Sequence, residues 1–311
     1  SICKTDLMSE SVREFPELQG IMGGHLSYAQ GFDKEIVDAI KEQYLPVGLD
    51  SAVPKKPFNF TLSITDKIDT LVGFFGVNEI PSSSKDPYAL RRTALGIIRI
   101  IIENKKDIKL NDLISYSSNL YLDQEFNFLN KNLKNDIKIF LKDRFRYYLK
   151  EKNIRHDIIE SSTNKFDLNK ISLIFQKSKS LNKVINEEIG NNIITSYKRA
   201  FNILQSEVKD INNDLSNTTD PGIFKNDFEK NLYKKINEIK KYFSGVLKDE
   251  NFHETLVVLS SAKKEIFDFF DNVKVNDDSD FVKKNRLELI NILCKTFENF
   301  IDFSIIKDIN E

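Results

Sequence analysis

Apolar residues recur along most of this chain at i, i+3, i+4 and i+7, the spacing that places them on one face of an α-helix. Residues 60–75 show the pattern clearly, with an apolar stripe at Ile64, Ile68, Leu71, Val72 and Phe75. Alternating runs of β-branched residues never reach strand length, and Pro occurs only seven times. The pattern predicts an all-α fold.

The periodic stretches predict helices over residues 6–15, 17–28, 34–44, 60–75, 126–152, 224–243, 253–270 and 279–303. A further helix is expected to begin at Asp86-Pro87, because Asp is a favoured N-cap and Pro suits the first helical position. Residues 45–57 and 77–85 are predicted loops. Segment 209–222 is polar and ends in a Pro-Gly turn, so it is the clearest candidate for a linker.

The composition suits a globular chain, with 40% hydrophobic and 30% charged residues. The longest apolar run, residues 95–102, is interrupted by Gly96 and Arg99 and falls short of the roughly 18 residues that a membrane span needs. The two cysteines, Cys3 and Cys294, lie at opposite ends and support neither a disulfide framework nor a thiolate metal site. We therefore expect a soluble, cytoplasmic protein without membrane contact.

The first residues, which lack an initiator Met, resemble the interior of a helix without a preceding cap. We expect the chain to be the C-terminal part of a longer protein.

Residues for catalysis are scarce. The three histidines, His25, His156 and His253, have no second His or Cys three or four residues away, and the sequence contains no nucleophile elbow, P-loop or dinucleotide-binding glycine pattern. Asp66 and Asp69 could form a carboxylate-only magnesium site, but a solvated acidic helix face explains them more simply. We predict neither a catalytic centre nor a metal site.

Nucleic-acid binding has better support, although the formal net charge is only −1. Five cations lie four residues apart on the predicted helix 126–152: Lys134, Lys138, Lys142, Arg146 and Lys150. They form a stripe roughly 24 Å long, enough to pass several phosphates. Tyr147, Tyr148 and His156 add rings on which unpaired bases could stack. A solvated face of a lysine-rich helix would look the same, and the sequence leaves both interpretations open.

Two shorter clusters combine basic residues with Asn and, in the first, aromatic rings: residues 197–202 (YKRAFN) and 283–286 (KKNR). Arg and Asn can read base edges through paired hydrogen bonds, but they can equally cap helices or bridge neighbouring elements.

Several blocks together resemble the β subunit of bacterial glycyl-tRNA synthetase, in order and spacing, over almost the whole chain. They are KTDLMSESVREFPELQGIMG (4–23), EQYLPVG (42–48), TDKIDTLVGFFGVNEIPSSSKDPYALRRTALGIIRI (65–100), IFLKDRFRYYLKEKNIRHDII (139–159), YKRAFNIL (197–204), FFDNVKVNDDSDFVKKNRLELI (269–290) and DFSII (302–306).

The resemblance implies an HD-like helical domain at residues 1–105, a helical linking region with the basic helix at 106–165, and a helical anticodon-binding domain at 166–311 similar to that of arginyl-tRNA synthetase. It also implies a tRNA-binding role within an α2β2 enzyme that uses tRNA(Gly). The α subunit would carry the catalytic site and use ATP and Mg, so this chain should hold no cofactor of its own.

The resemblance and the basic patches together give the candidate tRNA contacts. For the RNA backbone these are Lys138, Lys142, Arg144, Arg146, Arg155 and His156. For the anticodon side they are Tyr197, Lys198, Arg199, Asn202, Asn285 and Arg286.

Two alternatives remain. HD phosphohydrolases hold a metal between a His-Asp pair and a distant Asp, and Lys4-Thr5-Asp6 with Asp66 resemble remnants of that set without its histidines. A metal phosphohydrolase using Asp6, Asp66 and Asp69 is therefore one alternative, and a histidine upstream would favour it. The other is a structural scaffold that assembles subunits, suggested by the apolar segment FPELQGIMG (15–23).

Overall fold

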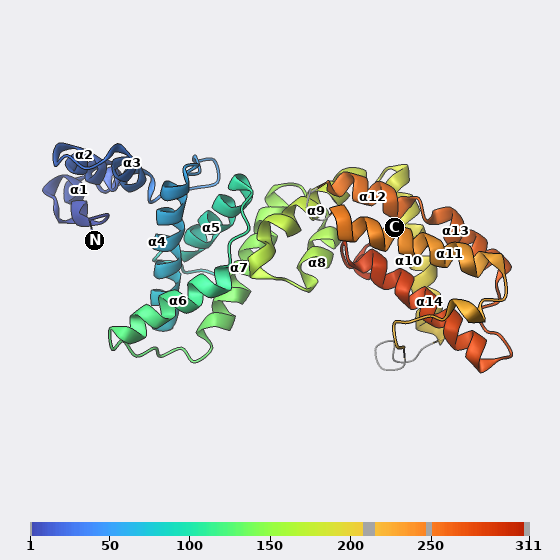
Figure 1. The fold of residues 1–311 in the computed structure, drawn as a ribbon. Coiled ribbons are helices and arrows are strands. Elements are labelled where there is room, and N and C mark those ends of the chain that lie inside the picture. The colour runs from blue at the N-terminus through green and yellow to red at the C-terminus, as the bar shows by residue number, and fades with distance from the viewer. Residues whose placement is uncertain (1, 208–214, 247–250, 308–311) are drawn as a thin grey trace. The chain divides into compact units, whose positions relative to one another are not determined.

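The computed structural model describes residues 2–207, 215–246 and 251–307, and these are helical with no strand, which confirms the all-α prediction. The chain divides into two compact units, residues 1–151 with 166–173, and residues 152–165 with 174–311 (Figure 1). The three-part division at residues 105 and 165 stays a prediction. No described helix has both the length and the apolar composition to cross a membrane.

The N-terminal unit contains η1 (Thr5–Met8), α1 (Glu10–Glu14), η2 (Pro16–Leu18), α2 (Ile21–Ala29), α3 (Lys34–Glu42), α4 (Pro57–Gly76), α5 (Leu90–Asn104), α6 (Leu110–Asp123), α7 (Leu133–Glu151) and η3 (Leu168–Lys170). Helix α4 packs against α3, α5, α6 and α7. Its predicted apolar stripe is buried as expected, and Val72 and Phe75 are completely inaccessible. Burial of this stripe explains why α4 is the central helix of the unit.

The C-terminal unit contains α8 (His156–Asn164), α10 (Glu188–Glu207), η4 (Pro221–Ile223), α11 (Asp227–Val246), α12 (Phe252–Ser260), α13 (Lys263–Asn272), α14 (Asp280–Glu298) and η5 (Phe303–Ile305), while α9 (Ile171–Val184) begins in the first unit and continues into this one. Helices α10 and α11 both contact α12, α13 and α14. Phe269, Phe297 and Phe303 fill the core between these elements.

The predicted helix start at Pro87 is wrong, because α5 begins at Leu90. Ala89 adopts a left-handed conformation with φ 53°, which separates Asp86-Pro87 from the helix. The Asp86 carboxylate nevertheless accepts hydrogen bonds from the backbone N–H groups of Leu90 (2.8 Å) and Arg91 (3.0 Å). Asp86 thus caps the helix, but from four residues before its first turn.

The predicted start at Phe126 is also wrong, because α7 begins at Leu133. Glu125 has a φ of 61°, and the rings of Phe126 and Phe128 pack against Tyr121 of α6 at centroid distances of 5.5 and 5.8 Å. These aromatic contacts hold residues 126–128 beside the end of α6, outside the helix that the sequence pattern predicts over 126–152.

Two C-terminal predictions need the same kind of correction. Residues 253–270 form two helices, α12 and α13, interrupted at Ser261-Ala262, and both halves turn apolar residues, such as Leu259 and Ile266, into the core. The last long helix ends at Glu298, not at residue 303.

In the predicted linker, residues 208–214 lie outside the described residues. The remainder, 215–222, is held against α14 by hydrogen bonds.

Candidate nucleic-acid interface

Helix α7 separates its apolar and basic residues sharply. Every fourth residue is buried: Leu133, Ile137, Leu141, Phe145 and Leu149 are at most 7% exposed. Each cation of the predicted basic stripe directly follows one of these buried residues in the sequence. Within it, Lys134, Lys138 and Lys150 are exposed, whereas Lys142 and Arg146 are half-buried. A negatively charged backbone could therefore approach the exposed lysines without displacing a core residue.

Arg144 of the same helix lies among aromatic rings. Its guanidinium lies 5.9 Å from the ring centroid of Phe140 and 5.8 Å from that of Tyr147. Its Nε is buried and has no hydrogen-bond partner within the described structure. These cation–π contacts occupy part of the guanidinium and leave it half-buried.

Arg155 and His156 belong to the C-terminal unit, whereas Lys138, Lys142, Arg144 and Arg146 belong to the N-terminal one. Arg155 makes a paired hydrogen bond with Asp157, with Nε–Oδ1 at 3.1 Å and Nη2–Oδ2 at 2.6 Å. The His156 side chain is 86% exposed at the first residue of α8, with Nε2 3.6 Å from a carboxylate oxygen of Glu160. His156 is thus the more accessible of the two to a ligand.

On α10, Tyr197 is a core residue. It is 1% exposed, packs against the rings of Phe201 and Phe303, and donates its hydroxyl hydrogen to Glu298 at 2.8 Å. Burial, with the nearby Cys294 and Glu298, raises the pKa of this hydroxyl far above its ordinary value. Tyr197 therefore stabilises the contact between α10 and the end of α14.

The rest of the α10 cluster is more accessible. Arg199 lies over the rings of Phe267 (4.8 Å) and Phe270 (5.3 Å) and pairs with Asp271 at 2.6 Å. Lys198 is half-buried and has an interacting partner, and Asn202 is exposed.

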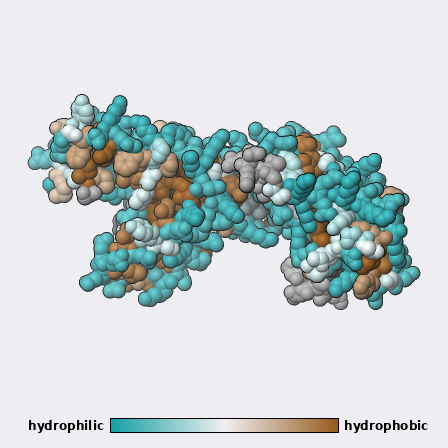
Figure 2. All heavy atoms as spheres, viewed as in Figure 1, coloured by the Kyte–Doolittle hydropathy of each residue, from teal (hydrophilic) through white to brown (hydrophobic). Residues whose placement is uncertain are grey.

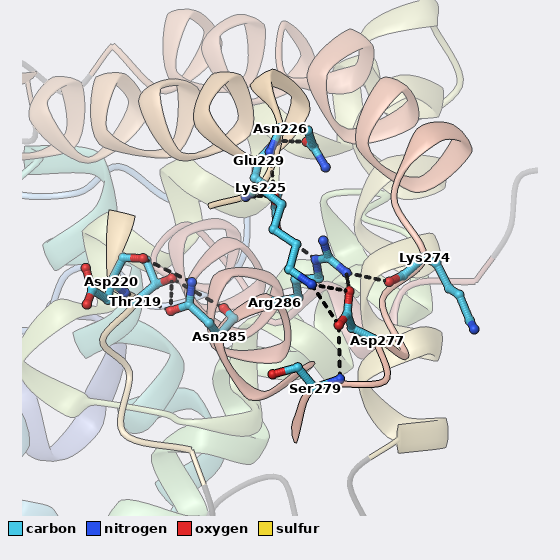
Figure 3. Close-up of polar contacts among 10 residues, drawn as sticks. All are labelled: Thr219, Asp220, Lys225, Asn226, Glu229, Lys274, Asp277, Ser279, Asn285 and Arg286. Carbon is cyan, nitrogen blue, oxygen red and sulfur yellow. Dashed lines mark hydrogen bonds and ion pairs between the residues drawn. The ribbon is translucent and has the colours of Figure 1, made fainter. Parts of the chain in front are cut away.

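Arg286 of α14 joins three segments of the C-terminal unit and is only 4% exposed (Figure 3). Nε donates to Glu229 Oε1 at 2.7 Å, and Nη1 donates to Asp277 Oδ2 at 2.8 Å and to the Lys274 carbonyl at 2.9 Å. The other oxygen of Glu229 accepts from the backbone N–H of Asn226, whose Oδ1 accepts from the N–H of Glu229, both at 3.1 Å. This reciprocal pair is a capping box at the start of α11.

Asn285 and Glu288, also on α14, hold the loop that precedes α11. Figure 3 shows the contacts of Asn285 with Thr219 and Asp220. Asn285 Oδ1 accepts from the backbone N–H of Asp220 at 2.8 Å and from the Thr219 hydroxyl at 2.9 Å, and its Nδ2 donates to the Asp220 carbonyl at 3.0 Å. Glu288 accepts from the Ser216 hydroxyl and the Asn217 N–H, each at 2.9 Å. In this structure Asn285 and Glu288 therefore hold the backbone of loop 216–220 in place, and Arg286 holds the backbone of Lys274.

Sequence reasoning overlooked Phe281, whose ring is 74% exposed in the first turn of α14. Phe281 and Lys284, which is also exposed, border a hollow of about 280 Å³ whose other wall is loop 216–223. The spacing of an aromatic and a cation three residues apart on a predicted helix could have indicated this surface.

Two of the three residues of the alternative metal site, Asp6 and Asp66, are already engaged. Asp6 is fully buried, and its Oδ2 accepts from the N–H groups of Gly20 (2.7 Å) and Gly23 (3.1 Å). Asp66 pairs with Lys4 at 2.6 Å. Within the described part of the chain, no three His, Cys, Asp or Glu side chains are grouped closely enough to hold a metal ion.

Comparison with known proteins relates both parts of the chain to one kind of protein. Residues 1–164 match the family model described as glycyl-tRNA synthetase beta subunit, and residues 193–307 match the DALR anticodon binding domain. Curated relatives named glycine--tRNA ligase beta subunit include those of Rickettsia canadensis (39% identical over 306 residues) and Rickettsia typhi (37% over 303 residues). Each match covers 97% of this chain but only 43% of the relative.

We predict that Arg286→Ala lowers the free energy of unfolding by about 3–5 kcal/mol, because it leaves the buried Glu229 carboxylate without its cation. Lys284→Ala, two residues away and exposed, should change it by less than about 0.5 kcal/mol. Urea unfolding of both variants tests this, and equal effects would contradict the role assigned to Arg286.

Asp277 gives a prediction for acid stability. The Ser279 N–H, Lys225 and Arg286 hold the pKa of Asp277 at about 2, below its usual 3.8. Because the folded-state pKa is the lower one, the stabilisation is present above about pH 4 and is lost as the pH falls towards 2. Thermal unfolding from pH 6 to pH 2 should show a smaller loss for Asp277→Asn than for the unchanged chain. The control Asp278→Asn, at a fully exposed neighbour, should keep the original pH profile.

Proposed function

Because the chain belongs to the glycyl-tRNA synthetase beta subunit family, whose model matches more than half of it, we propose that it provides tRNA binding to a glycine–tRNA ligase. Its substrate would be tRNA(Gly), including the anticodon, and it would have no catalytic site of its own. The observation that carries this proposal is the anticodon-binding domain match at residues 193–307. That range includes most of α10 and all of the helices from α11 to α14.

The basic face of α7 supports a second area of contact with the RNA. Lys134, Lys138 and Lys150 present charge at the surface, beside the buried apolar stripe of the same helix. Such lysines neutralise backbone phosphates and release bound counterions, which strengthens binding without reading sequence.

We further propose that the catalytic step, which uses ATP and Mg, belongs to an α subunit that joins this subunit in an α2β2 enzyme in the cytoplasm.

Exposed apolar side chains near the N-terminus support an assembly role in addition to tRNA binding. They are Leu7, Met8, Phe15, Ile21, Leu26 and Tyr28. Figure 2 shows hydrophobic residues on the visible surface of this region. Assembly alone remains the second candidate function. It would be favoured if the chain co-purified with an α subunit while its tRNA affinity stayed negligible.

The described structure gives no support to the phosphohydrolase alternative. Asp6 accepts a hydrogen bond from the backbone N–H of Gly20, and Asp66 forms an ion pair with Lys4.

The proposal predicts that the purified chain binds tRNA(Gly) more tightly than an unrelated tRNA, and that changes in the anticodon weaken binding. Filter binding or fluorescence anisotropy at fixed salt measures both effects. If the two tRNAs bind equally and the anticodon changes have no effect, anticodon recognition is ruled out.

For α7, we expect Lys138→Ala to weaken tRNA binding and to reduce the slope of log affinity against log salt concentration by about 0.9, the value for one lost phosphate contact on a duplex. The control is Lys34→Ala, which removes an exposed lysine from α3. An equal change in slope for both variants would show that only the overall charge matters, and not the α7 face.

A further inference from the structure

Phe281 is an aromatic ring presented to solvent at a fixed position. It lies in the first turn of α14 and is 74% exposed, more than any other described Phe or Tyr. No other described ring stacks against it. Leaving so large an apolar ring in water gains nothing for folding, whereas an unpaired base could cover its face by stacking.

Lys284 lies three residues further along α14, on the same side of the helix as Phe281. It is exposed, and it forms no ion pair with any residue that the structure describes. Its basic neighbours are engaged, because Lys283 pairs with Glu207 at 2.9 Å and Arg286 is buried with Glu229. In the KKNR segment, Lys284 is therefore the cation available to a phosphate.

The wall opposite these two side chains is prearranged. Asn285 and Glu288 fix the backbone of loop 216–220 through the hydrogen bonds described above. The hydroxyl groups of Ser216 and Thr218 lie 2.8 Å apart at the edge of the hollow. A hollow held in this way requires little ordering when a ligand enters it, which favours binding.

We propose that Phe281 and Lys284 form a subsite for one unpaired nucleotide, with the base stacked on Phe281 and the adjacent phosphate paired with Lys284. The hydroxyls of Ser216 and Thr218 are placed to hydrogen-bond a base edge or a ribose hydroxyl. This inference rests on the proposed function and identifies the part of the anticodon-binding domain that captures a single base.

The composition of the hollow favours a nucleotide over a protein partner. Its volume of about 280 Å³ lies near the lower end of the range for ligand pockets, about 300 Å³, which suits a small ligand such as one base. Apart from Phe281, only Ile223 contributes an apolar side chain to its lining. A docking protein would need a continuous apolar area, whereas a flat ring with an attached phosphate needs one aromatic face, one cation and a few polar groups.

The absence of tryptophan from the chain permits a direct test of stacking. Phe281→Trp introduces one fluorescent indole at the proposed platform, and Val257→Trp introduces one at an exposed position on α12. We expect an RNA hairpin carrying the anticodon loop of tRNA(Gly) to quench the fluorescence of Phe281→Trp and to leave that of Val257→Trp nearly unchanged. Equal quenching, or none at position 281, would overturn the proposal.

Affinity measurements give an independent test. Phe281→Ala should weaken binding of the same hairpin by about tenfold, while Phe281→Tyr, which keeps the ring, should bind nearly as well as the unchanged chain. Lys284→Ala should reduce the salt dependence of binding, and Lys284→Arg should restore it. Hairpins with one abasic position at a time should identify a single nucleotide whose removal abolishes the difference between Phe281→Ala and the unchanged chain.

The outcomes separate this inference from the proposed function. If the unchanged chain binds the hairpin with anticodon dependence but Phe281→Ala binds equally well, the subsite is wrong and the function stands. If the unchanged chain does not bind the hairpin, the proposed function itself fails. If Phe281→Ala changes the oligomeric state and leaves RNA affinity intact, a second copy of the chain covers the ring and the nucleotide subsite is overturned.

Discussion

The buried guanidinium of Arg286 determines how the C-terminal unit is assembled. A charge at 4% exposure is tolerated only where partners replace its lost hydration, and here Glu229, Asp277 and the Lys274 carbonyl do so. Since Glu229 also caps α11, one ionic contact aligns the start of that helix with α14 and with the segment that follows α13. Asn285 and Glu288, next to Arg286 on α14, then fix loop 216–220 and with it one wall of the Phe281 hollow.

A consequence is that several side chains of the types used to read RNA are committed to the fold. Tyr197, Asn285 and Arg286 have hydrogen-bonding groups suited to nucleic acid, but in this structure they bind within the unit, to Glu298, to the backbone of Asp220 and to the buried Glu229 respectively. The groups accessible to RNA are simpler: lysines on α7 and α14, an exposed imidazole at His156 and an exposed ring at Phe281. These groups suit backbone attraction and base stacking, with hydroxyls in loop 216–220 available for finer selection.

The N-terminal unit uses buried polar groups in a similar way. Lys67 is 5% exposed, and its ammonium group donates to the Leu45 carbonyl and the Ser63 hydroxyl, both at 2.9 Å. Burial lowers the pKa of Lys67 to about 8. Together with Asp6, which accepts from the N–H groups of Gly20 and Gly23, this lysine ties the loops around α2 and α3 to the helices beside them. The charged residues here contribute to packing.

The sequence alone determined the helical class, the buried stripe of α4 and the family resemblance, because helical periodicity and ordered sequence blocks are properties of neighbouring residues. It did not determine where α5 and α7 begin, since Ala89 adopts a left-handed conformation and the rings of Phe126 and Phe128 pack against Tyr121 of α6. Nor could it distinguish Lys284, which is exposed, from Arg286, which is buried two residues later. That difference depends on Glu229, which lies 57 residues away in the chain and meets Arg286 only when α11 packs against α14. Tertiary structure therefore decided which basic and aromatic side chains remain available to a partner, because a side chain that pairs with a buried charge, as Arg286 does with Glu229, is itself buried.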